Sequence, residues 1–463
     1  MNADMSFFER FGAVAPDAQT RYATDWTRDI SGRAGAVVRP RSTEEVADIV
    51  RHCAAQGLPI VPQGGHTGLV GGATPSAEGR EVVISLERLD RVREIDAENF
   101  TMTVEAGCIL EKIHAAAAAQ DRLFPLQLGA QGSCQIGGNI ATNAGGLNVV
   151  RYGVTRDLVL GLEVVLPDGQ IWNGLRKLRK NNTGYDLKQL FLGSEGTLGI
   201  VTAATLKLFP KPTQVETAFL AVTSPAAAVK LLGRARRDLS DLLSAFELLP
   251  RGGIEFGLTA APQARDPLDT PSPFYVLMEV AASGLIDLKA LVERFLESIV
   301  EDDLVSDGVL ASNAAQASAF WQIREGLNEA QARWGRHLRT DVSIPISSIA
   351  PFLDETYAEL ARSLPDCVPL AYGHLGDGNI HFNVLPPAHL DDAARIALLY
   401  RCEAVIFAGV DAAGGSISAE HGIGRVKRRA FLERTPPLDL ALLRKVKAAL
   451  DPDGLMSPGR IFD

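Results

Sequence analysis

The pattern of apolar and polar positions in the first two hundred residues predicts short strands and helices in alternation. Runs of β-forming residues predict strands at 36–40, 58–62, 81–85, 101–105, 161–166, 170–172 and 200–209. Helical periodicity predicts helices at 6–11, 42–56, 108–120 and 186–193. Ser42 or Thr43 suits the N-cap of the second helix, and Gly57 suits its end. This mixture predicts an α+β fold.

From Val215 onward the pattern changes, because glycine becomes rarer and longer amphipathic helices alternate with strands. The predicted strands are 217–222, 274–281 and 341–344, and the predicted helices are 226–239, 286–300, 314–334, 349–364 and 393–413. Two prolines within 207–212 indicate a domain boundary. We therefore expect a second domain built around one antiparallel sheet.

The stretch 371–384 predicts a hairpin, because Gly376-Asp-Gly-Asn379 tolerates positive φ and β-formers flank it. If this loop closes, His374 lies directly opposite His381, with Cβ atoms about 5 Å apart on one face. Two imidazoles so placed are part of a metal site that needs a third ligand. Glu420 offers the third ligand, and His421 beside it offers a base. The alternative is two unrelated histidines on a solvated strand face.

Two glycine-rich segments follow strands and carry almost no charge. The segment 63–72 has five glycines in ten positions, and 125–146 has six glycines with Ser133, Thr142 and two asparagines. Neither is a Walker A loop or a spaced Gly-x-Gly-x-x-Gly. An exposed backbone with neutral hydrogen-bonding groups suits a large planar cofactor with a pyrophosphate. A third glycine-rich turn lies at 193–200.

Composition limits the function classes. The 463 residues carry a formal net charge of −10, which argues against nucleic-acid binding. Five scattered cysteines without a Cys-x-x-Cys pair suit a reducing compartment. The first ten residues do not read as a signal peptide, and no apolar run reaches the roughly 18 residues of a membrane span. We therefore expect a cytoplasmic protein.

Seven motifs give the chain a resemblance to FAD-linked oxidoreductases of the vanillyl-alcohol-oxidase type, in the group of D-2-hydroxyacid dehydrogenases. Within this group it most resembles the enzymes of D-2-hydroxyglutarate. The motifs lie at 62–72, 129–146, 182–188, 193–200, 373–383, 420–422 and 455–459.

The resemblance implies a two-lobed FAD-binding domain at 1–212, an antiparallel-sheet α+β cap at 213–413, and a C-terminal segment at 414–463 that returns to the FAD domain. Within the FAD site it implies the pyrophosphate beside the first glycine segment, the flavin beside the second and the adenine side beside the third. The implied FAD contacts are Pro62, Gly64, Gly65, His66, Thr67, Gly68, Leu69, Leu128, Gly129, Gly132, Ser133, Gly137, Gly138, Asn139, Thr142, Asn143, Gly145, Gly146, Glu195, Gly196, Gly199 and Ile200.

The resemblance also implies the chemistry of the site. His374, His381 and Glu420 match metal ligands, for which we expect zinc or a similar divalent ion, and Asn383 and His421 match residues beside the reacting carbon. A hydride is expected to pass from C2 of a 2-hydroxy acid to flavin N5 while His421 takes the hydroxyl proton.

Substrate identity is less closely specified. Arg324 matches the group, but Asn328 and Arg339 stand where a 2-hydroxyglutarate enzyme would have threonine and lysine. Two arginines favour a second acidic group on the substrate, as in D-2-hydroxyglutarate or malate. The alternatives are a D-lactate or other monocarboxylate dehydrogenase, and an oxidase that uses oxygen. The expected electron acceptor is an electron-transfer flavoprotein or a quinone, and a homodimer is one possible assembly.

Two further features have alternative interpretations. His66 stands where asparagine is more usual, and a histidine in a similar turn is bonded covalently to FAD in the berberine-bridge branch. We expect His66 to make only non-covalent contacts. The basic run 427–429 suits either a docking patch for an acidic electron carrier or, as we expect, a solvated helix face.

Overall fold

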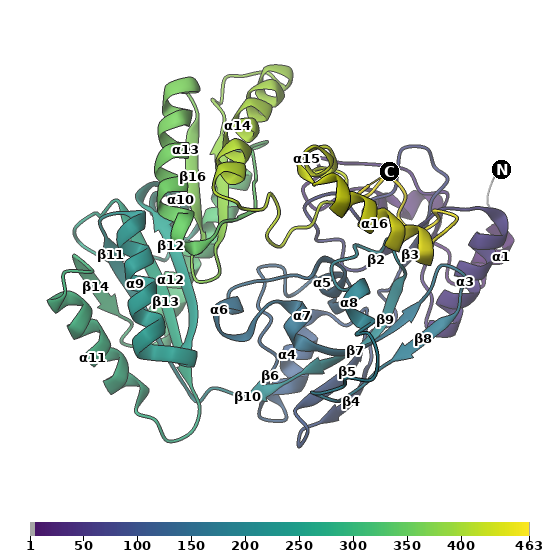
Figure 1. Ribbon diagram of the computed structural model, residues 1–463, viewed down its shortest axis with the longest axis horizontal. Helices are drawn as coiled ribbons and strands as arrows, with labels where there is room; N and C mark the ends of the chain where they lie inside the picture. Colours follow the sequence, from purple (N-terminus) through teal and green to yellow (C-terminus); the bar gives the residue numbers. More distant parts are fainter. Residues whose placement is uncertain (1–4, 463) are drawn as a thin grey trace. The chain divides into compact units, whose positions relative to one another are not determined.

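The computed structural model describes residues 5–462, and the chain divides into two compact units. Unit 1 contains the residues up to Gly145, Gly153–Lys211 and the chain from Glu420 onward. Unit 2 contains Gly146–Tyr152 and Pro212–Ala419. Figure 1 shows the helices and strands of both units. The functional domain limits at 212 and 413 stay a prediction.

The first lobe of unit 1 is a three-stranded parallel sheet in the order β1-β3-β2. Helix α3 (Thr43–Gln56) follows β1 and precedes β2 along the chain. It begins as predicted, because the Ser42 side chain accepts a hydrogen bond from Glu45 N, and it ends at Gly57 with φ of 61°. The strands are β1 (Ala36–Val38), β2 (Ile60–Gln63) and β3 (Val82–Ser85).

The second lobe of unit 1 is a five-stranded antiparallel sheet in the order β4-β5-β9-β7-β8. The predicted hairpin around residues 167–169 is confirmed, because β7 pairs with β8 across that turn. The partly exposed edge strand β4 is absent from the predicted elements. The strands are β4 (Val92–Asp96), β5 (Thr101–Glu105), β7 (Val159–Val165), β8 (Ile171–Gly174) and β9 (Ile200–Lys207).

The C-terminal segment is anchored to the first lobe by backbone hydrogen bonds. Ile60 N donates to Leu455 O at 2.8 Å, and Ser457 N donates to Ile60 O at 2.8 Å. The fully buried Arg460 donates to the carbonyl oxygens of Gly72 and Thr74. The other elements of unit 1 are α1 (Met5–Glu9), η1 (Pro16–Ala18), α2 (Thr20–Ala23), α4 (Leu110–Ala118), β6 (Arg122–Leu123), α5 (Ile136–Thr142), α7 (Thr155–Leu158), α8 (Lys188–Phe191), β10 (Phe209–Pro210), α15 (Arg428–Arg434) and α16 (Pro437–Leu450).

Unit 2 is built on a seven-stranded antiparallel sheet, as predicted, in the order β14-β11-β13-β12-β16-β17-β15. Its strands are β11 (Gln214–Val222), β12 (Leu243–Pro250), β13 (Phe274–Ala282), β14 (Asp307–Leu310), β15 (Val342–Ser343), β16 (Val368–His374) and β17 (Asn379–Leu385). Its helices are α6 (Val149–Tyr152), α9 (Pro225–Leu239), η2 (Ser240–Leu242), α10 (Arg251–Ala260), α11 (Leu288–Glu301), α12 (Ala314–Arg333), η3 (Ile346–Ser348), α13 (Ile349–Ser363) and α14 (Asp392–Ala412).

Side-chain alternation along these strands gives the sheet of unit 2 two apolar faces. Phe219 and Leu277 lie in one buried cluster with Ile323 and Leu327 of α12. Their strand neighbours Leu220 and Val276 are equally buried and point to the opposite face. Burial on both faces explains why these strands are continuous apolar runs rather than alternating ones.

The predicted hairpin of β16 and β17 is confirmed, but its predicted register is wrong by two residues. His381 lies opposite Tyr372, and His374 pairs instead with Glu247 on the neighbouring strand β12. The turn lies at residues 375–378 rather than 376–379, and the amides of Asp377 and Gly378 both donate to His374 O. A shift of two residues keeps side chains on the same face. His374 and His381 are therefore diagonal neighbours.

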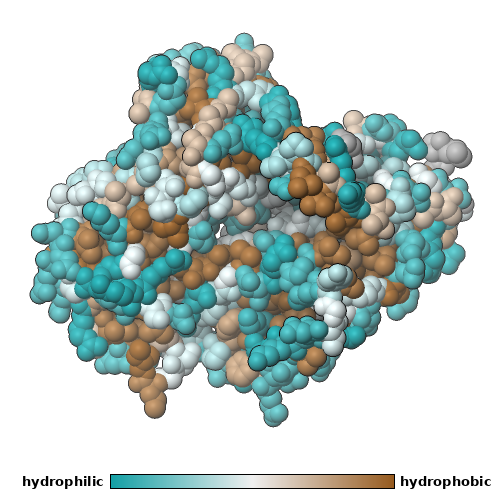
Figure 2. Space-filling view, viewed as in Figure 1, coloured by the Kyte–Doolittle hydropathy of each residue, from teal (hydrophilic) through white to brown (hydrophobic). Residues whose placement is uncertain are grey.

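Hydrophilic and hydrophobic side chains are interspersed over the visible surface (Figure 2). Among residues 5–462, no helix is both long and apolar enough to cross a membrane.

Candidate functional site

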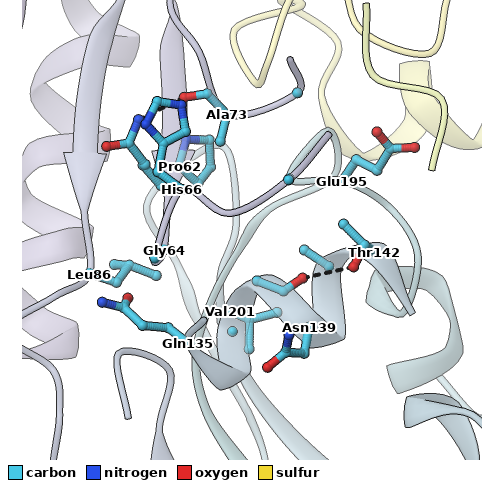
Figure 3. Close-up of a pocket in the computed structure, with 18 of the residues that line it drawn as sticks. Pro62, Gly64, His66, Ala73, Leu86, Gln135, Asn139, Thr142, Glu195 and Val201 are labelled. Carbon is cyan, nitrogen blue, oxygen red and sulfur yellow. Dashed lines mark hydrogen bonds between the residues drawn. The ribbon is translucent and has the colours of Figure 1, made fainter. Parts of the chain in front are cut away.

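A cavity in unit 1 is lined by all three glycine-rich segments. Its walls come from the loop after β2, the start of α5 and the turn before β9 (Figure 3). His421 of the C-terminal segment also lines it. The empty space is about 970 Å³, including the open mouth.

Glycines shape this cavity in two different ways. At Gly65 a Cβ atom would lie 2.1 Å from Ser133 O, so a side chain there would push the two glycine segments apart. At Gly138 a Cβ atom would meet nothing within 4 Å. The absent side chain at Gly138 therefore leaves open space where a ligand can approach the backbone.

Two buried acceptors on the cavity wall have no hydrogen-bond partner among the described residues. They are Gln135 Oε1 and Asn139 Oδ1, at the start of α5 and in its first turns. A buried acceptor without a donor costs about 1–3 kcal/mol. Bound FAD carries N–H and hydroxyl donors, so the residues present fit this cofactor.

Glu195 connects the cavity to the C-terminal segment. Its backbone adopts φ of 52°, which is uncommon for a residue with a side chain. Its carboxylate accepts hydrogen bonds from Ile423 N at 2.8 Å and Gly424 N at 2.7 Å. Burial raises the pKa of Glu195 and outweighs these two bonds. Glu195 thus fixes the backbone that immediately follows His421.

The basic run 427–429 was expected to lie on a solvated helix face, and this expectation is wrong for Lys427. Its side chain is buried, and its charge acts on Glu195 within unit 1. Only Arg429 of the three basic residues is exposed.

His66 lies in the cavity wall with both ring nitrogens in contact with protein oxygens. Nδ1 lies 3.2 Å from Arg21 O, and Nε2 lies 2.9 Å from Thr74 Oγ1. A carbonyl oxygen only accepts, so Nδ1 carries the proton and Nε2 accepts from the Thr74 hydroxyl. Burial lowers the pKa of His66, which favours this neutral form.

In unit 2, a buried glutamate lies between a predicted metal ligand and a predicted substrate residue. Glu247 Oε1 lies 2.5 Å from His374 Nδ1, and Glu247 Oε2 accepts from Arg324 Nε at 2.6 Å. Glu247 is fully buried and Arg324 is 5% exposed. Burial alone would raise the pKa of Glu247, but the charges and hydrogen bonds of His374 and Arg324 lower it to about 2.

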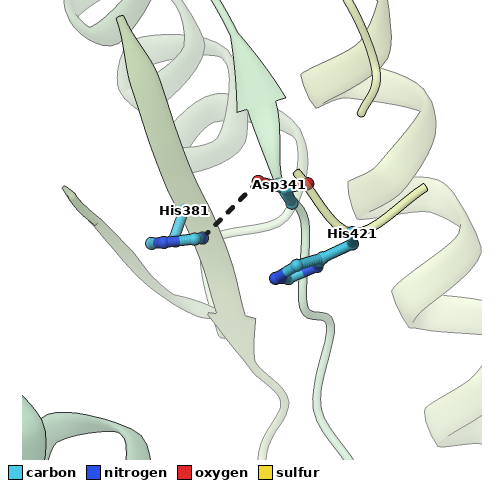
Figure 4. Close-up of side chains that lie close together, drawn as sticks. All are labelled: Asp341, His381 and His421. Atoms are coloured by element: carbon cyan, nitrogen blue, oxygen red, sulfur yellow. Dashed lines mark ion pairs between the residues drawn. The ribbon is translucent and has the colours of Figure 1, made fainter. Parts of the chain in front are cut away.

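His381 also has its Nδ1 turned toward a buried carboxylate. Nδ1 lies 3.9 Å from Oδ1 of the fully buried Asp341 (Figure 4). Asp341 is held in place because it accepts from Asn379 Nδ2 at 2.8 Å. The rings of His374 and His381 lie edge to face with centroids 5.4 Å apart. Both imidazoles therefore lie on the same side of the hairpin.

Beside the histidines lies a network of neutral polar groups. Tyr372 Oη donates to Asn328 Oδ1 at 2.7 Å. Asn383 Nδ2 donates to Gln331 Oε1 at 2.7 Å and contacts Tyr372 Oη at 3.1 Å. Arg339 is partly buried. Burial raises the pKa of Tyr372, and the charges of Arg324 and Arg339 act to lower it.

Glu420 and His421 begin the last segment of unit 1, directly after Ala419 of unit 2. In unit 2, Ala419 N donates to Asp341 Oδ2 at 3.1 Å, and Ser418 forms an isolated parallel β-bridge with Asp341. Consecutive Cα atoms are about 3.8 Å apart, so the backbone of Glu420 follows this anchored point immediately.

Fourteen of the predicted FAD contacts line the cavity. They are Pro62, Gly64, Gly65, His66, Thr67, Gly68, Gly137, Gly138, Asn139, Thr142, Glu195, Gly196, Gly199 and Ile200. The remaining eight are not among its lining residues; they are Leu69, Leu128, Gly129, Gly132, Ser133, Asn143, Gly145 and Gly146. Asn143 has another contact, because its side chain accepts from Arg156 N at 2.8 Å.

The residues missed by sequence reasoning carry weaker signals. Gln135 is one of three glutamines in the second glycine segment, so its residue type alone did not distinguish it. Glu247 is a lone acid in the apolar run 243–250. A charged residue in a buried strand requires a hydrogen-bonding or charged partner, so the position of Glu247 in this run indicated a polar contact.

Comparison with known proteins identifies two domains. Residues 34–174 match the model of the FAD binding domain, and residues 211–461 match that of the C-terminal domain of FAD linked oxidases. Among solved structures, p-cresol methylhydroxylase with bound substrate has a TM-score of 0.75 at 16% identity, covering 99% of this chain and 95% of that one. The 4-ethylphenol oxidase of Gulosibacter chungangensis has a TM-score of 0.71 at 18% identity, covering 100% and 94%. These likenesses confirm the expected fold class.

Curated relatives are similar along nearly the whole chain. The mitochondrial D-2-hydroxyglutarate dehydrogenase of Bos taurus is 41% identical over 443 residues, 95% of this chain and 78% of the relative. The D-2-hydroxyglutarate dehydrogenase of Xanthomonas citri pv. viticola is 41% identical over 442 residues, 96% and 92%. A D-2-hydroxyglutarate–pyruvate transhydrogenase of Saccharomyces cerevisiae is 35% identical over 457 residues, 97% and 91%. The chain therefore belongs to the family of FAD-linked D-2-hydroxyacid dehydrogenases of the vanillyl-alcohol-oxidase type.

Proposed function

We propose that this enzyme oxidises a D-2-hydroxy dicarboxylate, D-2-hydroxyglutarate being the expected case, to the 2-oxo acid. The observation that carries the proposal is the combination in unit 2 of two neighbouring histidines, each near a buried carboxylate, with the buried Arg324. Histidines suit a divalent cation, and a guanidinium suits a substrate carboxylate. The curated relatives named for D-2-hydroxyglutarate support the same substrate.

The residues proposed for metal binding are His374, His381 and Glu420. Two imidazoles and one carboxylate form a donor set suited to zinc with a position left for substrate. At His374 the contact with Glu247 makes Nε2 the nitrogen that would face the ion. When bound, FAD accepts a hydride equivalent from C2 of the substrate, and a divalent cation acts as a Lewis acid toward its hydroxyl group.

The chain's own residues have separate tasks in this proposal. His421 lines the FAD cavity, and its imidazole takes the hydroxyl proton of the substrate. Glu195 holds the backbone after His421, which limits how far that imidazole can move. Asn383 orients the substrate through Oδ1, which is buried and has no partner among the described residues.

Arg324 and Arg339 bind the second carboxylate, and Asn328 adds a neutral contact. Arg324 already shares its charge with Glu247, and this observation favours the second candidate, a D-lactate or other monocarboxylate dehydrogenase. The two candidates differ in the task of Arg339, because only a dicarboxylate brings a second carboxylate for it to bind.

Anaerobic bleaching of the flavin absorbance by D-2-hydroxy acids tests the proposal. We expect D-2-hydroxyglutarate to reduce the flavin with a higher kcat/KM than D-lactate, and the L-enantiomers to leave it oxidised. Faster reduction by D-lactate would favour the monocarboxylate candidate. A colourless protein that takes up no FAD would remove the basis of both.

The electron acceptor is a separate question. The expected electron-transfer flavoprotein or quinone stays a prediction, and the yeast relative named a transhydrogenase with pyruvate adds a 2-oxo acid as a third choice. Stopped-flow reoxidation by each of these and by oxygen distinguishes dehydrogenase from oxidase. The expected cytoplasmic location also stays a prediction, since the bovine relative is named mitochondrial.

A further inference from the structure

We infer that Glu247 is a positioning residue for metal binding, which sets the ring tautomer and orientation of His374 while Arg324 holds Glu247 in place. This inference rests on the proposed function, because it assumes a divalent cation at His374. It assigns a task to a residue outside the expected ligand set.

The contacts of Glu247 are divided between two partners. One oxygen lies 2.5 Å from His374 Nδ1, and the other accepts from Arg324 Nε at 2.6 Å. The strands fix this arrangement, since Glu247 and His374 are paired residues of β12 and β16. Glu247 is fully buried, so water does not compete for either oxygen.

The chemistry of the contact determines the tautomer. An ionised carboxylate only accepts hydrogen bonds, so His374 Nδ1 must carry the proton. The lone pair of a neutral imidazole then lies on Nε2, which is the atom that binds a cation. A carboxylate behind a metal-binding histidine fixes the ring and raises its basicity, and losing it typically costs about 10–100-fold in metal affinity.

Arg324 gains a second role from the same geometry. A fully buried carboxylate without a cationic partner would be costly, and the guanidinium at 2.6 Å offsets that cost. The alternative is that Arg324, Glu247 and His374 form an ion network that only stabilises the fold. A stabilising network would affect unfolding and leave the affinity for metal unchanged.

The experiment measures metal affinity without turnover. Glu247→Gln and a matched control, Glu279→Gln, are stripped of metal and titrated with Zn²⁺ against a chromophoric chelator. Glu279 is a partly buried strand glutamate of the same sheet, and its side chain contacts Ser244 and Trp321. We expect Zn²⁺ affinity to fall about 10–100-fold in Glu247→Gln and to be unchanged in Glu279→Gln, with FAD content equal in both. Equal Zn²⁺ affinity in folded Glu247→Gln and wild type would overturn the inference.

A second measurement covers the case in which Glu247→Gln does not fold. Wild-type protein with ¹⁵N-labelled histidine is compared by NMR with and without Zn²⁺, and His374 is assigned with His374→Asn. A proton on Nδ1 with Zn²⁺ shifting Nε2 supports the inference, and the reverse pattern overturns it. Wild type that binds no Zn²⁺ is a different result, because it removes the metal from the proposed function itself.

Discussion

The cavity of unit 1 and the histidine pair of unit 2 are formed by different kinds of chemical group. The cavity is formed largely by backbone, with glycines such as Gly138 leaving open space and neutral acceptors such as Gln135 Oε1 on its wall. The unit 2 site is formed by charged and imidazole side chains beside buried carboxylates, and Glu247 is within hydrogen-bond distance of His374. A large cofactor can be held by many weak contacts, whereas a metal ion and a small acid depend on a few precisely directed atoms. Substitutions in the two sites should therefore have different effects on the binding of FAD, metal and substrate.

The largest expected effect is at His381. His381→Ala should lose the metal, which should raise the activation free energy by about 5–6 kcal/mol and lower kcat about 10⁴-fold. FAD content should be unchanged, because none of the cavity-lining residues is altered. Metal analysis, flavin absorbance and steady-state kinetics of the same preparation test this. Loss of FAD together with metal would show that the two sites are not independent.

The second effect concerns substrate charge. Arg339→Ala should lower kcat/KM for D-2-hydroxyglutarate by about 2–5 kcal/mol, or roughly 30- to several-thousand-fold, and change the value for D-lactate far less. Arg324→Ala should instead lower both values, because it also leaves Glu247 buried without its cation. The ratio of the two substrates' kcat/KM is the measurement. An Arg339→Ala variant with equal losses on both would contradict a dicarboxylate site.

The third effect is in the cavity wall. Gly65→Ala should weaken FAD binding, because the added methyl would lie 2.1 Å from Ser133 O and the glycine segments would have to separate. Overpacking of this kind costs about 1–3 kcal/mol. Gly233→Ala is the control, since this exposed helical glycine has open space and alanine favours a helix. The FAD dissociation constants of the three proteins, measured by fluorescence titration, test this prediction. Equal values for Gly65→Ala and wild type would contradict the conclusion that close backbone packing shapes the cavity.

The same difference explains which features of the two sites could be predicted from the sequence. The glycine segments and most strands of the FAD domain depend on local signals, so they were predicted near their observed positions. Glu247 and His374 are 127 positions apart, and their pairing depends on the order of strands in the sheet. The turn signal at 376–379 did not determine the hairpin register either, since the observed ladder places His381 opposite Tyr372.

The burial of Lys427 was missed for a related reason. A run of three basic residues looks solvated from sequence, because long charged side chains are rarely fully buried. Here the segment after His421 passes close to Glu195, whose carboxylate attracts the ammonium group. Only the long-range path of the chain determines that contact.

A fourth prediction concerns the covalent state of FAD. Acid precipitation should release all of the FAD into the supernatant, because both ring nitrogens of His66 already contact Arg21 O and Thr74 Oγ1. His66→Ala should keep a bound flavin with at most a modest loss of affinity. Flavin absorbance that stays with the precipitate in wild type and is absent there in His66→Ala would show a covalent bond.

The smallest effect contrasts Glu247 with Glu163, a buried strand glutamate of unit 1 that also pairs with an arginine. Glu163 accepts from Arg93 at 3.0 Å, from Thr43 at 2.7 Å and from Thr202 at 2.9 Å. None of these partners is a proposed ligand, so Glu163→Gln should reduce the free energy of unfolding by about 1–3 kcal/mol at pH 7 and leave Zn²⁺ affinity unchanged.

The pH dependence of this effect follows from the pKa of Glu163. Burial raises that pKa, but the bonds from Arg93 and the two threonines lower it overall in the folded protein. A depressed folded pKa contributes stability above the unfolded value of about 4.3, and that stability is lost as pH falls through the folded value. The stability difference between wild type and Glu163→Gln should therefore be full at pH 7 and should shrink as the pH falls below about 4. Urea unfolding of both proteins across this range measures it. A difference that stays constant with pH would mean that Glu163 acts through packing rather than through its charge.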